Sequence, residues 1–500
     1  MKMLIGGKKV DASDGKTFDV INPATGEFID TVPMATKEDI DQAVRNARIG
    51  QKEWAAIPIV QREKIFNRFN ELLEEHRREL IVLSAKEMGK SAFVANFEIE
   101  GVIPMFRSYL EESKRLEDRI LVPGTELGHD GKTHTDMITV VHEPIGVIAA
   151  IVPFNAPMLL TAYKAAPILC AGNAAIIKPP SDNPLAAIRM CELLIEAGVP
   201  GNALQVVTGS GSVVGDGLIN HPGIDGVTMT GSTEVGLGIA EKMAKRLAYF
   251  GLELGGNDAF IVLDDANLEE AAMQAAQTRI TNAGQVCIAP KRFLVHNSLK
   301  KAFTEKVLEI VNASETGYDP NVEEQIDQFL GVVDCADVKV LVPPIINEKS
   351  AIKVENQVKH TLDQGAKLLA GGKRNGCFFE PTVLECTKDM DVAKDMEIFG
   401  PVIPIIGFDT LEEAIEITNG SKYGLSGCVF TNDWKKGHYV ARSCQTGTMV
   451  VNGTTMYRNM MQPFGGYKFS GYGREGLITL EEMTQTKNIV LKGFYNYEGK

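Results

Sequence analysis

The sequence predicts an α/β protein whose first large unit is a parallel sheet with helices on both faces. Short apolar segments such as "AAIIKP" and "GVTMTG" alternate with amphipathic stretches such as "NPLAAIRMCELLIEAG". This alternation is typical of a parallel sheet, because a helix must carry the chain back before the next parallel strand begins. A second α/β segment with the same alternation extends from about residue 258 to residue 470.

Three other stretches complete the predicted organisation. Residues 37–118 alternate apolar and charged positions at helical spacing and are predicted to be helical. In "KTHTDMITVVHEPIGVIAAIVPF" the polar, alternating first half predicts an exposed hairpin. The apolar second half predicts a buried parallel strand. Residues 315–342, which include Cys335, fit neither period and are predicted to be a surface excursion.

Composition excludes several classes of protein. With 500 residues, 44% of them hydrophobic, the chain can form a large core, and its net charge of −14 disfavours nucleic acid and anionic membrane surfaces as partners. Its most apolar segment, residues 147–177, is interrupted by prolines and polar residues, whereas a spanning helix needs ~18 apolar residues. Eight cysteines without CxxC pairs, and no signal peptide, predict reduced thiols and a cytoplasmic location. No cluster has metal-ligand spacing.

Two glycine-rich turns follow predicted strands. The first, "TGSGSVVG", contains Gly211 and Gly215 and differs by one residue from the dinucleotide fingerprint, so alone it is a weak signal. The second, "TGSTEVG", opens a helix at Ser232, where unpaired N–H groups can receive a phosphate. Lys178 stands at the carboxyl end of a strand, the edge at which open α/β sheets bind ligands, although in isolation it is an ordinary solvated lysine.

Three polar residues stand where a structural and a chemical interpretation compete. Asn155 lies between two prolines in "PFNAP", Glu253 lies within the apolar run "YFGLELGG", and Cys287 lies in "NAGQVCIAP". The structural interpretations are turn chemistry, a capped carboxylate at a sheet end, and a small buried residue. The chemical interpretations are an oxyanion donor, a general base with a pKa raised by burial, and a nucleophile.

The order of these motifs decides between the interpretations. The chain resembles the aldehyde dehydrogenase superfamily over nearly its full length, and it is nearest to the succinate-semialdehyde dehydrogenase branch. The separation of Glu253 and Cys287, 287 − 253 = 34 residues, is typical of that family. The matching motifs are PFNAP at 153–157, Lys178, GSTEVG at 231–236, Glu253, Cys287, EIFGP at 397–401 and PFGG at 463–466.

The resemblance implies NAD(P)-dependent oxidation of an aldehyde to its carboxylic acid. Cys287 would attack the aldehyde carbon, while the Asn155 amide and the backbone N–H of Cys287 hold the oxyanion. After hydride transfer, Glu253 would activate the water that hydrolyses the thioester, so water is the expected acyl acceptor. The small residues Ala283 and Gly284 are expected to leave room for cofactor and aldehyde beside the sulfur.

The resemblance also implies a site for NADP or NAD. Ser181 stands where many NAD-preferring relatives have a glutamate, so a 2′-phosphate would meet a hydroxyl donor and Lys178 instead of a carboxylate. We therefore expect NADP to be preferred. Glu397 is expected to hold the nicotinamide ribose, with Phe399 near the ring. The predicted cofactor residues are Val152, Pro153, Phe154, Lys178, Ser181, Gly211, Gly231, Ser232, Gly236, Leu254, Glu397 and Phe399.

The substrate is open at this stage. Two arginines often used in the succinate-semialdehyde branch are absent, and Tyr163 and Thr281 stand in their places. If Arg458 faces the pocket, an anionic semialdehyde such as succinate semialdehyde is expected; if it is a surface arginine, a neutral short-chain, hydroxy- or aromatic aldehyde fits better. A non-catalytic binding or structural relative is a third possibility, and it is disfavoured because Cys287, Glu253 and Asn155 are all present.

By the same resemblance, residues 1–120 and 145–254 form a dinucleotide-binding domain, 255–470 a catalytic domain, and 121–144 with 471–500 an oligomerisation arm and tail. An alternating, polar edge segment suits strand addition between subunits. We therefore expect a homodimer or homotetramer that acts on a small-molecule aldehyde, with no metal, nucleic acid or membrane as partner.

Overall fold

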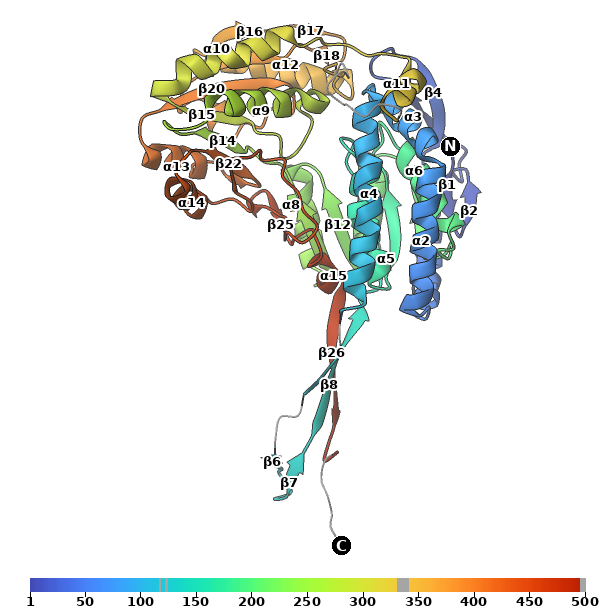
Figure 1. Cartoon of the computed structure of the whole chain (residues 1–500). Coiled ribbons are helices and arrows are strands. Elements are labelled where there is room, and N and C mark those ends of the chain that lie inside the picture. The colour runs from blue at the N-terminus through green and yellow to red at the C-terminus, as the bar shows by residue number, and fades with distance from the viewer. Residues whose placement is uncertain (117, 122–124, 331–340, 495–500) are drawn as a thin grey trace.

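The computed structural model describes residues 1–116, 118–121, 125–330 and 341–494. Two α/β bodies lie beside each other, and a long β arm extends away from the base of the N-terminal one (Figure 1). The predicted fold class is confirmed: both bodies are built on parallel sheets covered by helices. Among the described residues, no helix is long and apolar enough to cross a bilayer.

The N-terminal body contains an eight-stranded sheet. In spatial order its strands are β2 (Lys8–Val10), β1 (Met3–Ile5), β11 (Leu204–Val206), β10 (Ala174–Lys178), β9 (Val147–Ile151), β12 (Gly226–Thr230), β13 (Tyr249–Glu253) and β25 (Gly471–Tyr472). The five strands from β11 to β13 run parallel, and the order reverses between β9 and β12. This is the doubly wound topology, in which ligands bind where the order reverses.

Helices cover both faces of this sheet because alternate residues of each strand enter different cores. Ile148 and Ala150 of β9 join the core beneath α2 (Ile59–Glu75), α3 (Arg77–Met88), α4 (Ala92–Ser113), α5 (Pro157–Cys170) and α6 (Leu185–Glu196). Val147 and Ala149 join the core beneath α1 (Lys37–Ala55), α7 (Asp216–Asn220) and α8 (Thr233–Ala244). Residues that are apolar at every position, as in β9, are what burial on both faces requires.

The second body contains a seven-stranded sheet. Its spatial order is β16 (Lys367–Ala370), β19 (Thr382–Cys386), β20 (Val402–Phe408), β15 (Arg292–His296), β14 (Ala259–Val262), β22 (Gly427–Phe430) and β23 (Val450–Val451). All neighbours are parallel except β16 and β19. One face packs against α9 (Leu268–Ile280) and α10 (Asn297–Ala313), and the other against α12 (Glu348–Asp363), α13 (Leu411–Asn419) and α14 (Trp434–Ser443).

The surface excursion predicted at 315–342 contains a helix, α11 (Val322–Leu330), which packs against the N-terminal body. Val322 and Ile326 are buried in the core beneath α3 and α4, so part of this segment belongs to the core instead of lying loosely on the surface. Arg78 Nη1 donates to Asp327 Oδ1 at 2.7 Å. Residues 331–340, including Cys335, lie outside the described residues.

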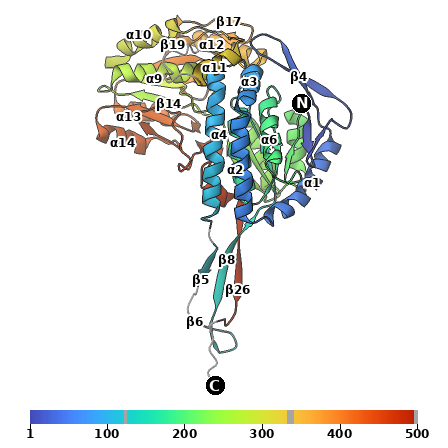
Figure 2. The same cartoon turned by 45° about the vertical axis from the view of Figure 1, so that its right-hand side comes forward.

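The arm is a three-stranded sheet of β5 (Arg119–Leu121), β8 (Met137–Pro144) and β26 (Thr484–Leu491), with the short pair β6 (Thr125–Leu127) and β7 (Thr133–Thr135) beyond it (Figure 2). The tail enters the arm later than the boundary at residue 471 implied. Gly471–Tyr472 forms the edge of the first sheet against β13, and α15 (Thr479–Glu482) packs on α4 and α5. Only from Thr484 onward does the tail pair with β8.

Candidate active site

The candidate site lies between the two bodies, where the loops of both sheets meet. On the first body, residues 152–155 follow β9 and Gly231 follows β12, on either side of the reversal in strand order. On the second body, Cys287 precedes β15 and Glu397 precedes β20. The carboxyl ends of one parallel sheet therefore face the amino ends of the other, which brings together residues far apart in the chain.

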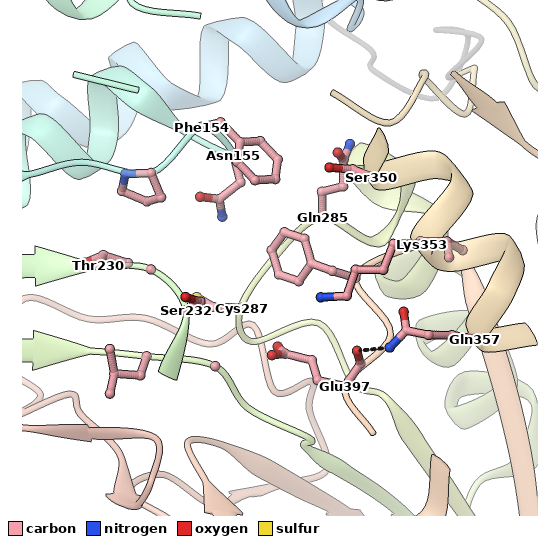
Figure 3. Close-up of a pocket in the computed structure, with 16 residues that line it drawn as sticks. Phe154, Asn155, Thr230, Ser232, Gln285, Cys287, Ser350, Lys353, Gln357 and Glu397 are labelled. Atoms are coloured by element: carbon pink, nitrogen blue, oxygen red, sulfur yellow. Dashed lines mark hydrogen bonds between the residues drawn. The ribbon is translucent and has the colours of Figure 1, made fainter. Parts of the chain in front are cut away.

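A cleft at this junction collects many of the predicted residues (Figure 3). Those that line it are Pro153, Phe154, Asn155, Gly231, Ser232, Leu254, Cys287, Glu397 and Phe399. Sequence reasoning missed Thr230, Gly255, Gln285, Ser350, Lys353, Val354 and Gln357. Four of the missed residues come from α12 at positions i, i+3, i+4 and i+7, so they form one stripe of that helix. That stripe is the signal that could have found them.

The loop that carries Cys287 has an unusual backbone. Asn282 and Ala283 have φ angles of 51°, and Gly284 follows with φ 70°. A Cβ on Gly284 would lie 2.3 Å from the carbonyl oxygen of Gly400, so glycine is required by the close approach of another backbone segment. Ala283 is buried in the second body's core. Packing and backbone geometry therefore give both residues a structural role in this loop.

Three buried polar side chains that were not predicted as site residues hold this loop through hydrogen bonds to backbone carbonyls. Gln285 donates to the carbonyl oxygens of Asn282 (3.0 Å) and Pro344 (3.2 Å) and accepts from the N–H of Ile346. Arg279 is fully buried and donates to the carbonyl oxygens of Val402, Gly284 and Ile398. The same guanidinium thus ties the Cys287 loop to the segment that carries Glu397.

Lys291 is the third of these residues and lies closest to the cysteine. Its buried ammonium donates to the carbonyl oxygen of Cys287 at 2.6 Å and stands 3.6 Å from Glu397 Oε1. Burial raises the pKa of the Cys287 thiol to about 12, and the positive charge of Lys291 is the largest opposing influence. The thiol is partly exposed and packs beside Phe464 and Ile288.

Asn155 reaches the cleft from the opposite side. In Figure 3 its amide points into the cleft on the side facing Cys287. The backbone carbonyl oxygen of Asn155 accepts from Asn282 Nδ2 at 3.1 Å, which joins the two loops. The preceding carbonyl, of Phe154, accepts from Asn183 Nδ2 at 2.7 Å, and the phenyl rings of Phe154 and Phe399 meet edge to face with centroids 5.9 Å apart.

Glu253 is the last residue of β13 and is buried behind the cleft. Its Oε1 atom has no hydrogen-bond partner among the described residues. Burial raises the pKa of Glu253 well above its usual value, and the negative charge of Glu475 raises it further, while Lys164 and Arg458 oppose the shift. A buried carboxyl oxygen without a partner, next to a second carboxylate, is suited to accept a proton from a molecule that enters the site.

Arg458 is not a surface residue. Its guanidinium carbon lies 3.6 Å from the ring centroid of Phe464 and 4.5 Å from that of Tyr163. Its Nη2 donates to Glu475 Oε2 at 3.0 Å, and Glu475 Oε1 also accepts from Lys164 at 2.8 Å. Because Phe464 also packs beside Cys287, the guanidinium lies on the cysteine side of the site.

Thr281, the other residue considered for substrate binding, is placed differently. Its hydroxyl donates to the carbonyl oxygen of Gln277 at 2.7 Å, one turn back along α9, and it is not among the residues that line the cleft. The structure therefore brings Tyr163 and Arg458 together and leaves Thr281 as a residue that closes the end of a helix.

The predicted cofactor residues at the carboxyl end of β10 are closely packed. The Lys178 ammonium is buried and donates to the carbonyl oxygen of Pro179 at 3.0 Å; burial lowers its pKa to about 8, against the opposing charge of Asp182. Ser181 Oγ donates to the carbonyl oxygen of Gly209 at 3.0 Å. The N–H of Val152 donates to the carbonyl of Lys178 at 3.1 Å and links this strand end to the neighbouring one.

The glycines of the predicted cofactor set differ in what they do. A Cβ on Gly236 would lie 2.4 Å from a methyl carbon of Leu254, so this glycine lets α8 pack against the loop after β13. At Gly255, which was not predicted, a Cβ would lie 2.4 Å from Glu397 Oε2, so a side chain there would displace the Glu397 carboxylate. Gly211 is exposed, and a Cβ there would meet no atom within 4 Å, so packing gives no reason for a glycine.

The donor set fits a dinucleotide. Ser232 caps α8 with its side chain and leaves the first N–H groups of that helix at the mouth of the cleft. Lys178 supplies a cation at the neighbouring strand end, and the Glu397 carboxylate, held by the N–H of Gly256 at 3.2 Å, supplies a hydroxyl acceptor. Among the described residues, no group of three or more His, Cys, Asp or Glu side chains could hold a metal ion.

A doubly wound sheet that faces a cysteine loop across a cleft is the architecture of a dinucleotide-dependent oxidoreductase. The chain belongs to the aldehyde dehydrogenase family, whose model matches residues 10–489. It is an NAD(P)-dependent aldehyde oxidoreductase, as the resemblance of the motifs implied.

Similar proteins extend over nearly the whole chain. A 3-sulfolactaldehyde dehydrogenase of Priestia aryabhattai is 36% identical, over 95% of this chain and 94% of its own. Retinal dehydrogenase 2 of Homo sapiens is 36% identical over 98% and 92%, and the NADP(+) succinate-semialdehyde dehydrogenase GabD of Escherichia coli is 34% identical over 95% and 94%. The crystal structure of betaine aldehyde dehydrogenase from Staphylococcus aureus in complex with NAD+ is 33% identical, with a TM-score of 0.90 over 99% and 95%.

Proposed function

We propose that this enzyme oxidises an anionic aldehyde, such as succinate semialdehyde, to the carboxylic acid, with NADP as the preferred cofactor. The observation that carries the proposal is the partly buried guanidinium of Arg458, whose side chain is 20% exposed, on the cysteine side of the site. Glu475 accepts from one of the five N–H groups of a guanidinium, which leaves others for a substrate carboxylate or sulfonate. Two relatives, named for succinate semialdehyde and 3-sulfolactaldehyde, support an anionic substrate.

The residues at the carboxyl edge of the first sheet would hold the cofactor. The N–H groups at the start of α8 would receive the pyrophosphate, Lys178 and Ser181 the 2′-phosphate, and Glu397 the nicotinamide ribose. When bound, the cofactor supplies a hydride acceptor. The protein would hold the ring beside Phe399 and exclude water from the face turned toward Cys287.

The remaining chemistry belongs to three side chains. The Cys287 thiol gives up its proton to water as its sulfur attacks the aldehyde carbon to form a thiohemiacetal; burial disfavours the thiolate, and the nearby Lys291 charge is the largest influence that favours it. The Asn155 amide and the backbone N–H of Cys287 donate to the oxyanion. Loss of hydride leaves a thioester on Cys287. Glu253 then takes a proton from water, whose oxygen attacks the acyl carbon and displaces the thiolate as the acid forms.

A substrate panel tests the proposed specificity. Succinate semialdehyde and butanal have the same chain length and differ in the terminal carboxylate. In Arg458→Met we expect kcat/KM for succinate semialdehyde to fall about 10- to 100-fold, the range for a lost charge-assisted hydrogen bond, while butanal loses much less. Butanal also reports on any disturbance of Glu475 and Glu253. Equal losses on both aldehydes would show that Arg458 supports the site without binding the substrate.

A second candidate is a neutral aldehyde. Two observations favour it: Tyr163 and Phe464 form an aromatic wall around Arg458, and the charge of Arg458 is already paired with Glu475. Retinal dehydrogenase 2, a relative that is 36% identical to this chain, is named for such a substrate. A higher kcat/KM for butanal or an aromatic aldehyde than for succinate semialdehyde in the wild-type enzyme would support this candidate.

A further inference from the structure

Two helices that follow predicted binding loops lack a side-chain cap from their own sequence. α5 begins at Pro157, two residues after Asn155, and its cap position, Ala156, provides no side-chain acceptor. α6 follows the loop of Lys178 and Ser181, and its cap position, Pro184, provides none either. Several other helices cap themselves, among them α1 with Thr36, α4 with Ser91 and α8 with Ser232, whereas α2 and α3 also lack a side-chain cap. The first N–H groups of α5 and α6 therefore need acceptors from another part of the fold.

A buried glutamate of α4 supplies the acceptor for α5. Glu98 is 4% exposed, and its Oε2 atom accepts from the N–H groups of Met158 (3.0 Å) and Leu159 (3.4 Å). The two helices approach closely here, since a Cβ on Gly101 would lie 2.6 Å from a methyl carbon of Leu159. Asn155 precedes Met158 by three residues, so this contact fixes the end of the turn from which the Asn155 amide projects.

A buried glutamate of α3 does the same for α6. Glu87 is fully buried, and its two carboxylate oxygens accept from the N–H groups of Leu185 (2.7 Å) and Ala186 (3.0 Å). The chain between Lys178 and Leu185 is short and contains three prolines. Because prolines restrict the backbone, anchoring Leu185 also limits where Lys178 and Ser181 can lie.

A buried cation pairs with Glu98 and lies near Glu87. The Lys90 ammonium is 1% exposed and forms an ion pair with Glu98 Oε1, which also accepts from Ser84 Oγ at 3.1 Å. Burial raises the pKa of Glu87 to about 8, and the N–H groups of Ala186 and Leu185 oppose that shift, followed by the charge of Lys90. The corner between α3 and α4, which lies beside α5 and α6 (Figures 1 and 2), thus holds a buried cluster of two carboxylates and one ammonium.

We propose that Glu98 and Glu87 are positioning residues for the two halves of the active site. Glu98 holds the turn that presents Asn155 to the reacting carbonyl, with Lys90 as its counter-charge, and Glu87 holds the loop that presents Lys178 and Ser181 to the cofactor. This inference rests on the roles proposed above for Asn155 and Lys178. It gives the buried cluster a function beyond stability: one charged corner sets both oxyanion geometry and cofactor geometry.

Matched amide variants separate this role from a general structural one. Glutamine keeps the size of glutamate but presents one acceptor and one donor end, so in Glu98→Gln either Lys90 or the start of α5 faces an N–H group. We expect the pre-steady-state rate of cofactor reduction to fall about 10- to 100-fold, because a small displacement of an oxyanion donor is costly. The dissociation constant for NADPH should stay unchanged in this variant.

Glu87→Gln is the control and should show the opposite profile. We expect the dissociation constant for NADPH to rise severalfold, while the rate of cofactor reduction at saturating NADP stays at the wild-type value. A merely structural role would lower the thermal midpoint of both variants and change both readouts alike. Identical profiles in the two variants would therefore overturn the proposal.

A double-variant comparison identifies the residue through which Glu98 acts. If Glu98 acts through Asn155, Asn155→Ala combined with Glu98→Gln should reduce cofactor no more slowly than Asn155→Ala alone. Additive losses, or a wild-type rate in Glu98→Gln beside a slow Asn155→Ala, would overturn the inference and leave the proposed oxyanion role intact. A wild-type rate in Asn155→Ala would instead contradict the proposed function.

A second variant tests the proposal even if Glu98→Gln does not fold. If Glu98→Gln is unstable because Lys90 is left as a lone buried charge, the paired variant Lys90→Met with Glu98→Gln removes both charges of that ion pair. It still lacks the carboxylate at the start of α5, so its rate of cofactor reduction should remain low. A folded paired variant with the wild-type rate would overturn the proposal.

Discussion

Lys178 is the residue through which pH is expected to affect cofactor choice. Burial lowers its pKa to about 8, so its ammonium is half charged near that pH, mostly charged well below it and mostly neutral well above it. A neutral amine attracts a 2′-phosphate less strongly, so KM for NADP should rise as pH increases through 8, while KM for NAD rises less. Steady-state kinetics with both cofactors between pH 6.5 and 9.5 measure this, and a ratio of the two KM values that is independent of pH would contradict it.

At the same scale, sequence motifs pointed to the side chains that are proposed to react but missed the residues that hold them. Asn155, Glu253 and Cys287 stand in motifs whose order is specific, and Asn155 and Cys287 line the cleft. Arg279 and Lys291 act through hydrogen bonds to backbone carbonyls, some of which are more than a hundred residues away. Contacts of this kind leave no periodicity or spacing in the sequence, so only the folded chain reveals them.

At the scale of elements, α11 is the clearest departure from expectation. The helix is nine residues long, and its apolar residues Val322, Ile326, Phe329 and Leu330 stand at i, i+4, i+7 and i+8, a helical spacing that the prediction of a surface excursion overlooked. Val322 and Ile326 are buried in the first core. Its contact surface, the corner of α3 and α4, is set by tertiary packing that the local sequence does not encode.

This packing predicts the effect of a charge on the buried face of α11. Ile326→Asp places a carboxylate among the apolar side chains of the first core, and we expect the free energy of unfolding to fall by about 2–3 kcal/mol. Glu324→Ala, on the exposed face of the same helix, should change it little and serves as the control. Urea titrations followed by circular dichroism give both values, and equal stability of the two variants would show that α11 does not contribute to the core.

At the scale of the whole molecule, the arm predicts self-association. The arm strands expose apolar side chains, among them Ile120 (63%), Leu121 (47%), Ile489 (45%) and Val490 (48%). A sheet that projects from the body with apolar residues on its surface is expected to be covered by another copy of the chain. Light scattering should therefore give a homodimer or homotetramer for the wild type and a smaller species for Ile120→Asp with Ile489→Asp. A monomeric wild type would contradict this expectation.

Sequence alternation also predicted two successive units built on parallel sheets. The path of the C-terminal segment, in contrast, could be seen only in the structure. Gly471–Tyr472 is too short to be recognised as a strand, and its place at the edge of the first sheet depends on β13 being adjacent. The C-terminal segment runs first along the N-terminal body and then along the arm. On this path it places the Glu475 carboxylate near Glu253.

The central claim is that Cys287 carries the acyl group and Glu253 releases it. Glu253→Gln, mixed with NADP and succinate semialdehyde, should form one reduced cofactor per active site, followed by absorbance, and then stall. The stalled enzyme is then quenched in acid. Mass spectrometry should find the acyl mass on the peptide that contains Cys287, and Cys287→Ser should form neither product. Continuous turnover of Glu253→Gln at the wild-type rate, or an acyl group on any other residue, would contradict the account.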